Sequence, residues 1–272
     1  MTKKSAIIDS VLEYTASSGK TSNALLDPVT EYVAAEGLAV DWILETHPHA
    51  DHLTGAAVLK SKYPGSQYGI GEGIKCVAAT FHALLALDDE VLDSERYFDR
   101  LFKEGDTFQL GSRQCRVLDV PGHTPACVAY YFEDDAVFIG DTLFMPDQGS
   151  ARCDFPKGSA ATLWDSTQRL LALPEHVRVF VGHDYGGVGA KREMAFETTV
   201  GDEKRESIHV KEGTEKDIFI KRRTERDATL AVPNLLFASI QVNIRGGQFP
   251  PPEKNGVSYL KTPLNVTITQ DH

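Results

Sequence analysis

The sequence predicts an α/β fold. Over roughly the first 185 residues, short apolar runs rich in β-branched residues alternate with longer segments of helical composition. Hydrophobic residues make up 42% of the 272-residue chain, which is enough for a sizeable core. Charged residues make up 25%, as in ordinary globular proteins. These observations favour one large globular domain, alone or with an appendage.

The N-terminal part predicts alternating strands and helices. The expected elements are strands at 5–14 and 22–27, a helix at 29–37, a strand at 40–46 and a helix at 53–62. Pro28 opens the first helix, and the turn signal Pro64-Gly65 ends the second. Residues 73–104 are weakly periodic and acidic, which predicts a helical insertion.

The rest of the chain continues the alternation and then changes character. The expected elements are strands at 106–111, 114–120, 126–132 and 136–140, a helix at 162–173 and a strand at 177–181. After about residue 190, the segment 201–228 is dense in charges, which predicts solvated helical faces. We expect a core domain at 1–190 and an extension at 191–272 that packs on it.

The bulk composition narrows the function classes. A formal net charge of −11 argues against nucleic acid as the main partner, because phosphate binding requires a basic face. No apolar run approaches the length of a membrane-spanning helix, and the N-terminus MTKKSAIIDS lacks the apolar region of a secretion signal. The four cysteines show no CxxC spacing. We therefore expect a cytoplasmic protein with buried thiols and no membrane contact.

Four short motifs gather metal-ligand side chains in one order along the chain. The first is HPHADH, and the others are PGHT, GDT and GHD; together they supply His47, His49, Asp51, His52, His123, Asp141 and His183. Each motif follows a strand-like run, so neighbouring strand ends can bring these side chains to one sheet edge. A lone histidine after a strand is more often hydrogen-bonded or exposed than a ligand. The ordered set favours a metal site, and its ligand types suit zinc, iron or manganese.

This ordered set resembles the metallo-β-lactamase fold superfamily over residues 5–190. The resemblance implies an αββα sandwich, with the metal site at one edge, and here a C-terminal helical or extended appendage. In many members the residues that match His47, His49 and His123 hold one ion. Those that match Asp51, His52 and His183 hold a second, and the match of Asp141 bridges the two.

The remaining motifs indicate a branch of the superfamily. Asp141 stands in GDTLF, whereas β-lactamases of this fold usually lack the bridging aspartate. Nuclease branches add a large second domain. RCDF, GHDY and QVNIRGG resemble persulfide dioxygenases, in particular a bacterial β-lactamase-like hydrolase subgroup. That resemblance implies glutathione contacts at Arg152, Tyr185 and Arg245, an orienting role for Asp154, and a C-terminal extension that contributes to the substrate pocket.

The dioxygenase resemblance implies a chemistry for the site. One Fe(II) per chain would be held by His47, His123 and Asp141, while His49, Asp51, His52 and His183 would orient ligands or line a vacant second site. The substrates would be glutathione persulfide and O2, the products sulfite and glutathione, and the role sulfide detoxification. A sulfurtransferase partner and a homodimer are compatible with this hypothesis.

Two other functions stay open at the level of the sequence. A glyoxalase II-like thioester hydrolase would use the same residues to hold two ions and a bridging hydroxide. A sensor or scaffold that binds a metal without turnover is the third hypothesis. Cys153, beside Arg152, is either an inert thiol or a sulfur relay.

Overall fold

The computed structural model describes residues 3–186, 192–266, 268 and 270, and it divides into two compact units. Unit 1 comprises Met1–Phe102, Gln109–Arg113 and Ala231–Thr267, and unit 2 comprises Lys103–Phe108, Gln114–Leu230 and Ile268–His272. Both units mix helices and strands, which confirms the α/β class. The predicted division into residues 1–190 and 191–272 stays a prediction. No helix among the described residues is long and apolar enough to cross a membrane.

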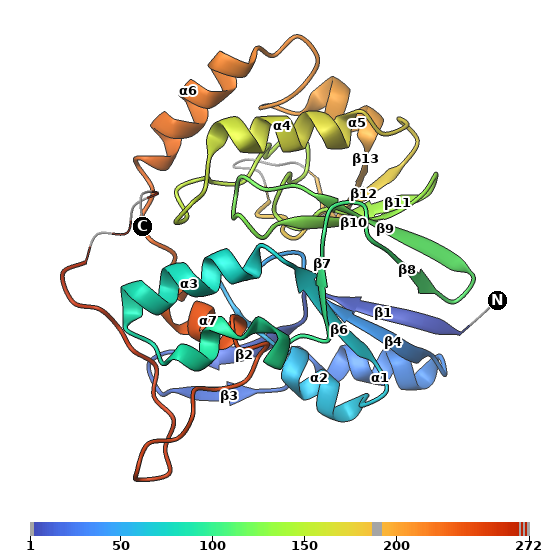
Figure 1. Ribbon diagram of the computed structural model, residues 1–272. Helices are drawn as coiled ribbons and strands as arrows, with labels where there is room; N and C mark the ends of the chain where they lie inside the picture. The colour runs from blue at the N-terminus through green and yellow to red at the C-terminus, as the bar shows by residue number, and fades with distance from the viewer. Residues whose placement is uncertain (1–2, 187–191, 267, 269, 271–272) are drawn as a thin grey trace. The chain divides into compact units, whose positions relative to one another are not determined.

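Unit 1 contains a four-stranded parallel sheet (Figure 1). Its strands, in spatial order, are β1 (Lys4–Ile8), β4 (Ala39–Leu44), β6 (Gln67–Gly71) and β7 (Arg100–Phe102). Ile43, Leu44 and Ile70 are buried, as expected for a parallel sheet whose strands are largely apolar. The sheet delivers the end of β4 to the first histidine motif.

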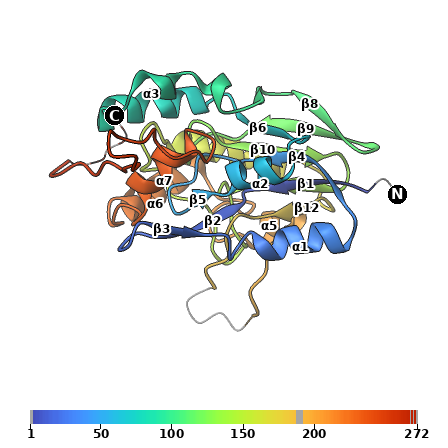
Figure 2. The ribbon, with the colours of Figure 1, turned by 90° about the horizontal axis from the view of Figure 1, so that it is seen from below.

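A second sheet of unit 1 supports the segment after that motif. It has the order β3–β2–β5, with β2 at Val11–Thr15, β3 at Lys20–Ser22 and β5 at Leu53–Thr54. The helices of this unit are α1 (Asp27–Ala35), α2 (Ala56–Lys62), α3 (Ile74–Leu85), the short 3-10 helices η1 (Asp89–Leu92) and η2 (Ser94–Arg96), and α7 (Leu236–Asn243). Helix α7 lies beside β5 (Figure 2). The C-terminal part of the chain thus returns to the neighbourhood of the histidine motif.

A six-stranded mixed sheet belongs mostly to unit 2. Its strands, in spatial order, are β13 (Glu197–Thr199), β12 (Arg178–Phe180), β11 (Ala136–Phe138), β10 (Val128–Phe132), β9 (Arg113–Asp119) and β8 (Thr107–Leu110). The helices of unit 2 are α4 (Ala160–Leu171), α5 (Val200–Glu206) and α6 (Lys216–Asp227), and Figure 1 shows α4 and α5 on one face of the sheet. Val137, Leu163 and Phe219 belong to one buried apolar cluster that joins sheet and helices.

The predicted elements of unit 2 are confirmed within a few residues, whereas several in unit 1 are wrong. The predicted strand at 5–14 is two strands, because the chain turns at Asp9 with a φ of 53°. Residues 22–27 are not a strand, since only Lys20–Ser22 pairs and α1 already begins at Asp27. The predicted helix at 53–62 begins at Ala56, because Leu53 and Thr54 pair with β2.

The helical insertion predicted at 73–104 is also only partly helical. The end of this segment forms the strand β7. It pairs in parallel with β6, and the sequence predicted neither strand. Two glycines weaken the strand signal of β6 (QYGIG). A Cβ at Gly69 would lie 2.5 Å from the ring of Phe102, so close packing between β6 and β7 requires glycine there.

The charged segment 201–228 is not a set of fully solvated faces, which corrects the sequence prediction. Glu203 of α5 and the pair Arg223 and Asp227 of α6 are buried. Arg223 Nε donates to Asp227 Oδ1 at 2.9 Å, and both side chains are about nineteen-twentieths covered. Charge density alone could not reveal this, because burial depends on which side of each helix packs on the core.

Glu203 makes the stability of the protein sensitive to pH. Burial raises the pKa of its carboxyl from 4.5 to about 8. Between pH 4.5 and about 8, this carboxyl is protonated in the folded state but ionised in the unfolded state. The free energy of unfolding therefore falls as pH rises through that window. The slope is at most about 1.4 kcal/mol per pH unit. We expect Glu203→Gln to flatten it in urea titrations, and the exposed Glu206→Gln to leave it unchanged.

Candidate metal centre

The HPHADH motif lies in unit 1, between β4 and β5. The apolar end of β4 leads directly into it, and the side chains of His47 and His49 are 1% and 3% exposed. Asp51 is exposed and His52 is partly buried. A strand end followed by an irregular segment therefore places two imidazoles in a buried setting, where they must be hydrogen-bonded or hold an ion.

The hydrogen bonds of His47 define which of its ring nitrogens carries the proton. Thr46 Oγ1 donates to Asp9 Oδ2 at 2.8 Å, which uses its single hydrogen. Thr46 Oγ1 also lies 3.0 Å from His47 Nδ1, so Nδ1 is the donor in that pair. In a neutral imidazole the proton on Nδ1 leaves the Nε2 lone pair available as a metal ligand.

His49 lies between two carboxylates. Its Nε2 is 3.0 Å from Asp9 Oδ1 and 3.2 Å from Glu45 Oε2. Burial lowers the pKa of His49, but the two carboxylates outweigh burial and hold it well above its ordinary value. Burial raises the pKa of Asp9, yet His49 and the hydrogen bonds from Thr46 bring it below its usual range, whereas burial keeps the pKa of Glu45 raised. These contacts fix the His49 ring by its Nε2 edge.

His49, Asp51 and His52 each offer a ligand atom, and these atoms lie within 4.8 Å of one another. Within the described part of the chain, His49 Nδ1 and His52 Nε2 are buried without a hydrogen-bond partner. Burial, followed by repulsion from His49, lowers the pKa of His52 and favours its neutral form. The group offers ligand types for a transition ion, which would have to displace the Nδ1 proton of His49, and it belongs entirely to unit 1.

His123 belongs to unit 2 and follows a tight turn at Gly122. Gly122 has a φ of 135°, and a Cβ there would lie 2.4 Å from the backbone of Leu163, so this position requires glycine. His123 Nδ1 lies 2.7 Å from the carbonyl oxygen of Arg152. A carbonyl can only accept, so Nδ1 carries a proton, and in a neutral imidazole this leaves the Nε2 lone pair available.

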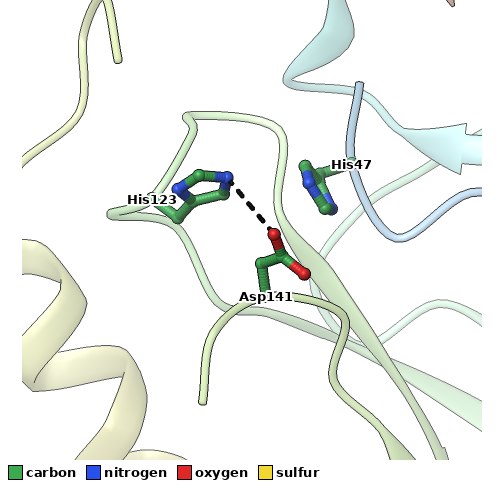
Figure 3. Close-up of side chains that lie close together, drawn as sticks. All are labelled: His47, His123 and Asp141. Carbon is green, nitrogen blue, oxygen red and sulfur yellow. Dashed lines mark ion pairs between the residues drawn. The ribbon is translucent and has the colours of Figure 1, made fainter. Parts of the chain in front are cut away.

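Asp141 lies beside His123 within the same unit. Its Oδ2 is 3.9 Å from His123 Nε2 (Figure 3, dashed line), and its Oδ1 is 3.6 Å from His183 Nε2. These separations are longer than hydrogen bonds, and they suit atoms that share an ion at roughly 2.1 Å from each. Unit 2 thus brings together the three ligand-type residues predicted from PGHT, GDT and GHD.

Gly182 leaves room for the Asp141 carboxylate. The backbone conformation of Gly182 is one that other residues can adopt. However, a Cβ at this position would lie 2.4 Å from Asp141 Oδ1. We expect Gly182→Ala to displace the carboxylate and weaken metal binding by about 10- to 100-fold, the range seen when the support of a ligand is removed. Chelator competition would measure it. Gly65→Ala, where a Cβ meets only open space, is the control; equal affinities in both variants would contradict the prediction.

The predicted substrate residues of unit 2 are ordered by neighbours. Arg152 Nε and Nη2 donate to Asp154 Oδ1 and Oδ2, both at 2.6 Å, so Asp154 fixes the guanidinium plane. Tyr185 is 68% exposed, and its ring stacks on His183 with centroids 5.3 Å apart. The predicted contacts of these residues with glutathione stay predictions.

Arg245 belongs to unit 1 and is 2% exposed. Its Nε donates to Glu90 Oε1 at 3.1 Å and its Nη1 to the Gln241 carbonyl oxygen at 2.7 Å. The side chain therefore supports the packing of its own unit, and its predicted role in binding glutathione stays a prediction. Cys153 is fully buried, and burial raises the pKa of its thiol, which favours the inert thiol over a nucleophile.

Comparison with known proteins places the chain in a family. The family model "Metallo-beta-lactamase superfamily" matches residues 3–183. The chain belongs to the metallo-β-lactamase superfamily. "Glyoxylase B2" of Dictyostelium discoideum is 53% identical over 264 residues, which span 97% of this chain and 90% of that protein. A "Beta-lactamase hydrolase-like protein" of Agrobacterium fabrum is 46% identical over 261 residues, 96% of this chain and 59% of that protein.

Solved structures extend the likeness beyond the family model. The crystal structure of ETHE1 from Myxococcus xanthus matches with a TM-score of 0.70 and 27% identity, over 91% of this chain and 90% of that one. The metallo-β-lactamase fold predicted from the ordered motifs is confirmed, and the hydrolase-like and ETHE1 likenesses support the predicted branch.

Sequence reasoning missed the residues that hold the ligands. Asp9, Glu45 and Thr46 each contact His47 or His49, but none of them stood out from the sequence as part of the site. One signal was available, because Asp9 interrupts two strand-like runs and aspartate tolerates a positive φ. Its proximity to the histidines depends on the parallel pairing of β1 with β4, which joins residues far apart in the chain.

Proposed function

We propose that this metallo-β-lactamase-fold protein is a persulfide dioxygenase that converts glutathione persulfide and O2 to sulfite and glutathione. The observation that carries the proposal is the likeness to ETHE1 over about nine tenths of both chains, which agrees with the resemblance of RCDF, GHDY and QVNIRGG to persulfide dioxygenases. The likeness reaches past the family model, which ends at residue 183, into the part of the chain that contains α5, α6 and α7.

The ligand set fits a single redox ion. We propose that His47 and His123, each with its proton on Nδ1, present Nε2 to one Fe(II), and that Asp141 supplies a carboxylate oxygen. Two histidines and one carboxylate are the ligands typical of non-haem iron oxygenases. When bound, such an iron supplies the electron transfer to O2 that zinc cannot. His183 Nε2 lies 3.6 Å from Asp141 Oδ1, so it would line a vacant second site beside that carboxylate.

The proposed substrate contacts use side chains that are already oriented. Asp154 holds the Arg152 guanidinium in one plane, which suits a planar carboxylate of glutathione. Tyr185, exposed and stacked on His183, can offer its hydroxyl to a ligand. Thr46 accepts from Nδ1 of His47, and the Arg152 carbonyl accepts from Nδ1 of His123. Both histidines would therefore hold this proton on the side of the ring away from the ion.

The test combines metal analysis with two assays. Protein purified without added metal should contain about one iron per chain. It should consume O2 only when glutathione persulfide is present, and it should release sulfite. Reconstitution of stripped protein with Zn²⁺ should restore metal content but not O2 uptake. Iron-loaded protein that consumes no O2 with glutathione persulfide would overturn the proposal.

A second candidate is a dinuclear thioester hydrolase of the glyoxalase II type. It is favoured by the ligand atoms of His49, Asp51 and His52, which can hold a second ion. The names of the two relatives, a glyoxylase and a hydrolase-like protein, agree with it. Two metal ions per chain, with thioester hydrolysis and no O2 uptake, would identify this function instead.

A further inference from the structure

Helix α7 carries an asparagine whose side chain contacts the histidine motif directly. Asn243 is the last residue of α7 and is 3% exposed. Its Nδ2 donates to the carbonyl oxygens of His49, at 2.8 Å, and His52, at 2.9 Å. Its Oδ1 accepts from the backbone N–H of Thr54 at 2.8 Å. All four residues belong to unit 1.

These three hydrogen bonds match the chemistry of a primary amide. An asparagine side chain has two N–H donors and one carbonyl acceptor, and each of them has a backbone partner here. Residues 47–52 lie outside the helices and strands, so this irregular backbone depends on side chains for part of its hydrogen bonding. One buried amide therefore sets the spacing of two carbonyls and an N–H on both sides of Asp51.

The turn after Asn243 is shaped to lie on the same segment. Gly246 and Gly247 have φ values of 59° and 85°. A Cβ at Gly247 would lie 2.9 Å from the backbone nitrogen of Ala57 and 3.3 Å from Thr54 Cγ2. Larger residues could not make this approach. The NIRGG sequence thus packs against the segment from β5 to the start of α2.

We propose that Asn243 is a positioning residue for the metal centre, through its hold on the backbone of the HPHADH motif. The inference rests on the metal site of the proposed function but not on the reaction. By fixing the carbonyls of His49 and His52, Asn243 holds in place the backbone from which the imidazoles of this motif project. Support of this kind typically changes metal affinity by about 10- to 100-fold when it is lost.

The same helix offers a matched control. Gln241 of α7 is also a buried amide, 1% exposed. Its Nε2 donates to the carbonyls of Phe237 and Lys261, and its Oε1 accepts from the Lys261 N–H. It has the same number of hydrogen bonds as Asn243, but they join its own helix and the C-terminal segment and do not reach the histidine motif. A purely structural role should give both amides similar effects.

The experiment compares Asn243→Asp with Gln241→Glu in the full chain. Asn243→Asp keeps the acceptor for Thr54 but places an oxygen against two carbonyls. We expect it to weaken Zn²⁺ and Co²⁺ binding by about 10- to 100-fold in chelator competition, and to alter the visible spectrum of bound Co²⁺. Gln241→Glu should leave both unchanged, even where it lowers the melting temperature.

The outcomes separate this inference from the proposed reaction. Wild-type affinity and spectrum in Asn243→Asp, or equal changes in both variants, would overturn it. Should Asn243→Asp fail to fold, Asn243→Ser keeps one donor in a smaller side chain and is tested in the same way. A specific loss of Zn²⁺ and Co²⁺ affinity supports the inference even when the protein consumes no O2 with glutathione persulfide.

Discussion

Asp141→Asn is expected to remove most of the metal from the protein and to abolish activity. The change replaces the charged oxygen of a proposed ligand with an amide, at a side chain that is only 9% exposed and lies 3.9 Å from His123 Nε2. Because loss of mere support for a ligand lowers affinity by about 10- to 100-fold, loss of the ligand itself should exceed about 100-fold. Elemental analysis and chelator competition would measure the effect.

The control for this prediction is the same substitution on the surface of unit 2. Asp165 lies on α4, is 66% exposed and pairs with Lys216. Asp165→Asn should keep wild-type metal content and activity, since an exposed pair contributes little. Wild-type metal content in Asp141→Asn would show that this carboxylate is not a ligand.

Arg223→Ala is expected to lower the free energy of unfolding by about 3–5 kcal/mol, because it leaves the Asp227 carboxylate buried without its cation. Arg223 and Asp227 are 6% and 5% exposed. Arg223 Nη1 also donates to the Ser150 carbonyl, and the Cys153 N–H donates to Asp227 Oδ2 at 2.7 Å. The pair thereby holds the segment on either side of Arg152. Urea titration would measure the loss.

An exposed pair on the same helix provides the matched comparison. Lys221 and Glu225 of α6 have the same spacing as the buried pair and are 75% and 67% exposed. Lys221→Ala should cost at most about 1 kcal/mol. Similar losses in Lys221→Ala and Arg223→Ala would show that the buried position of Arg223 does not matter. A double-mutant cycle with Asp227→Ala would isolate the energy of the pair.

The elements that could be predicted from the sequence are those whose local signals agree. The strand β10 (VAYYF) combines β-branched and aromatic residues between turn signals, and the structure places it where the pattern predicts. Strand β6 (QYGIG) could not be predicted, since Gly69 is there to accommodate the ring of Phe102. A contact with a distant residue leaves no periodic signal.

The candidate site shows the same division. The ligand-type residues His123, Asp141 and His183 could be found because each of their motifs follows a strand and begins at a glycine or a turn. Asn243 could not, although it lies within the QVNIRGG stretch, because an asparagine in a helix gives no sign of its partner. The buried Arg223–Asp227 pair was hidden for a related reason, since charge density resembles that of a solvated helix.

The sequence by itself determined the α/β class, the superfamily and the ordered set of ligand types, because these depend on local patterns and on spacing along one chain. Only the tertiary structure decided which nitrogen of each histidine carries its proton, which carboxylates hold His49, and which residue of α7 supports the HPHADH motif. The physical reason is that hydrogen bonds between segments far apart in sequence form only when folding brings their donors and acceptors together.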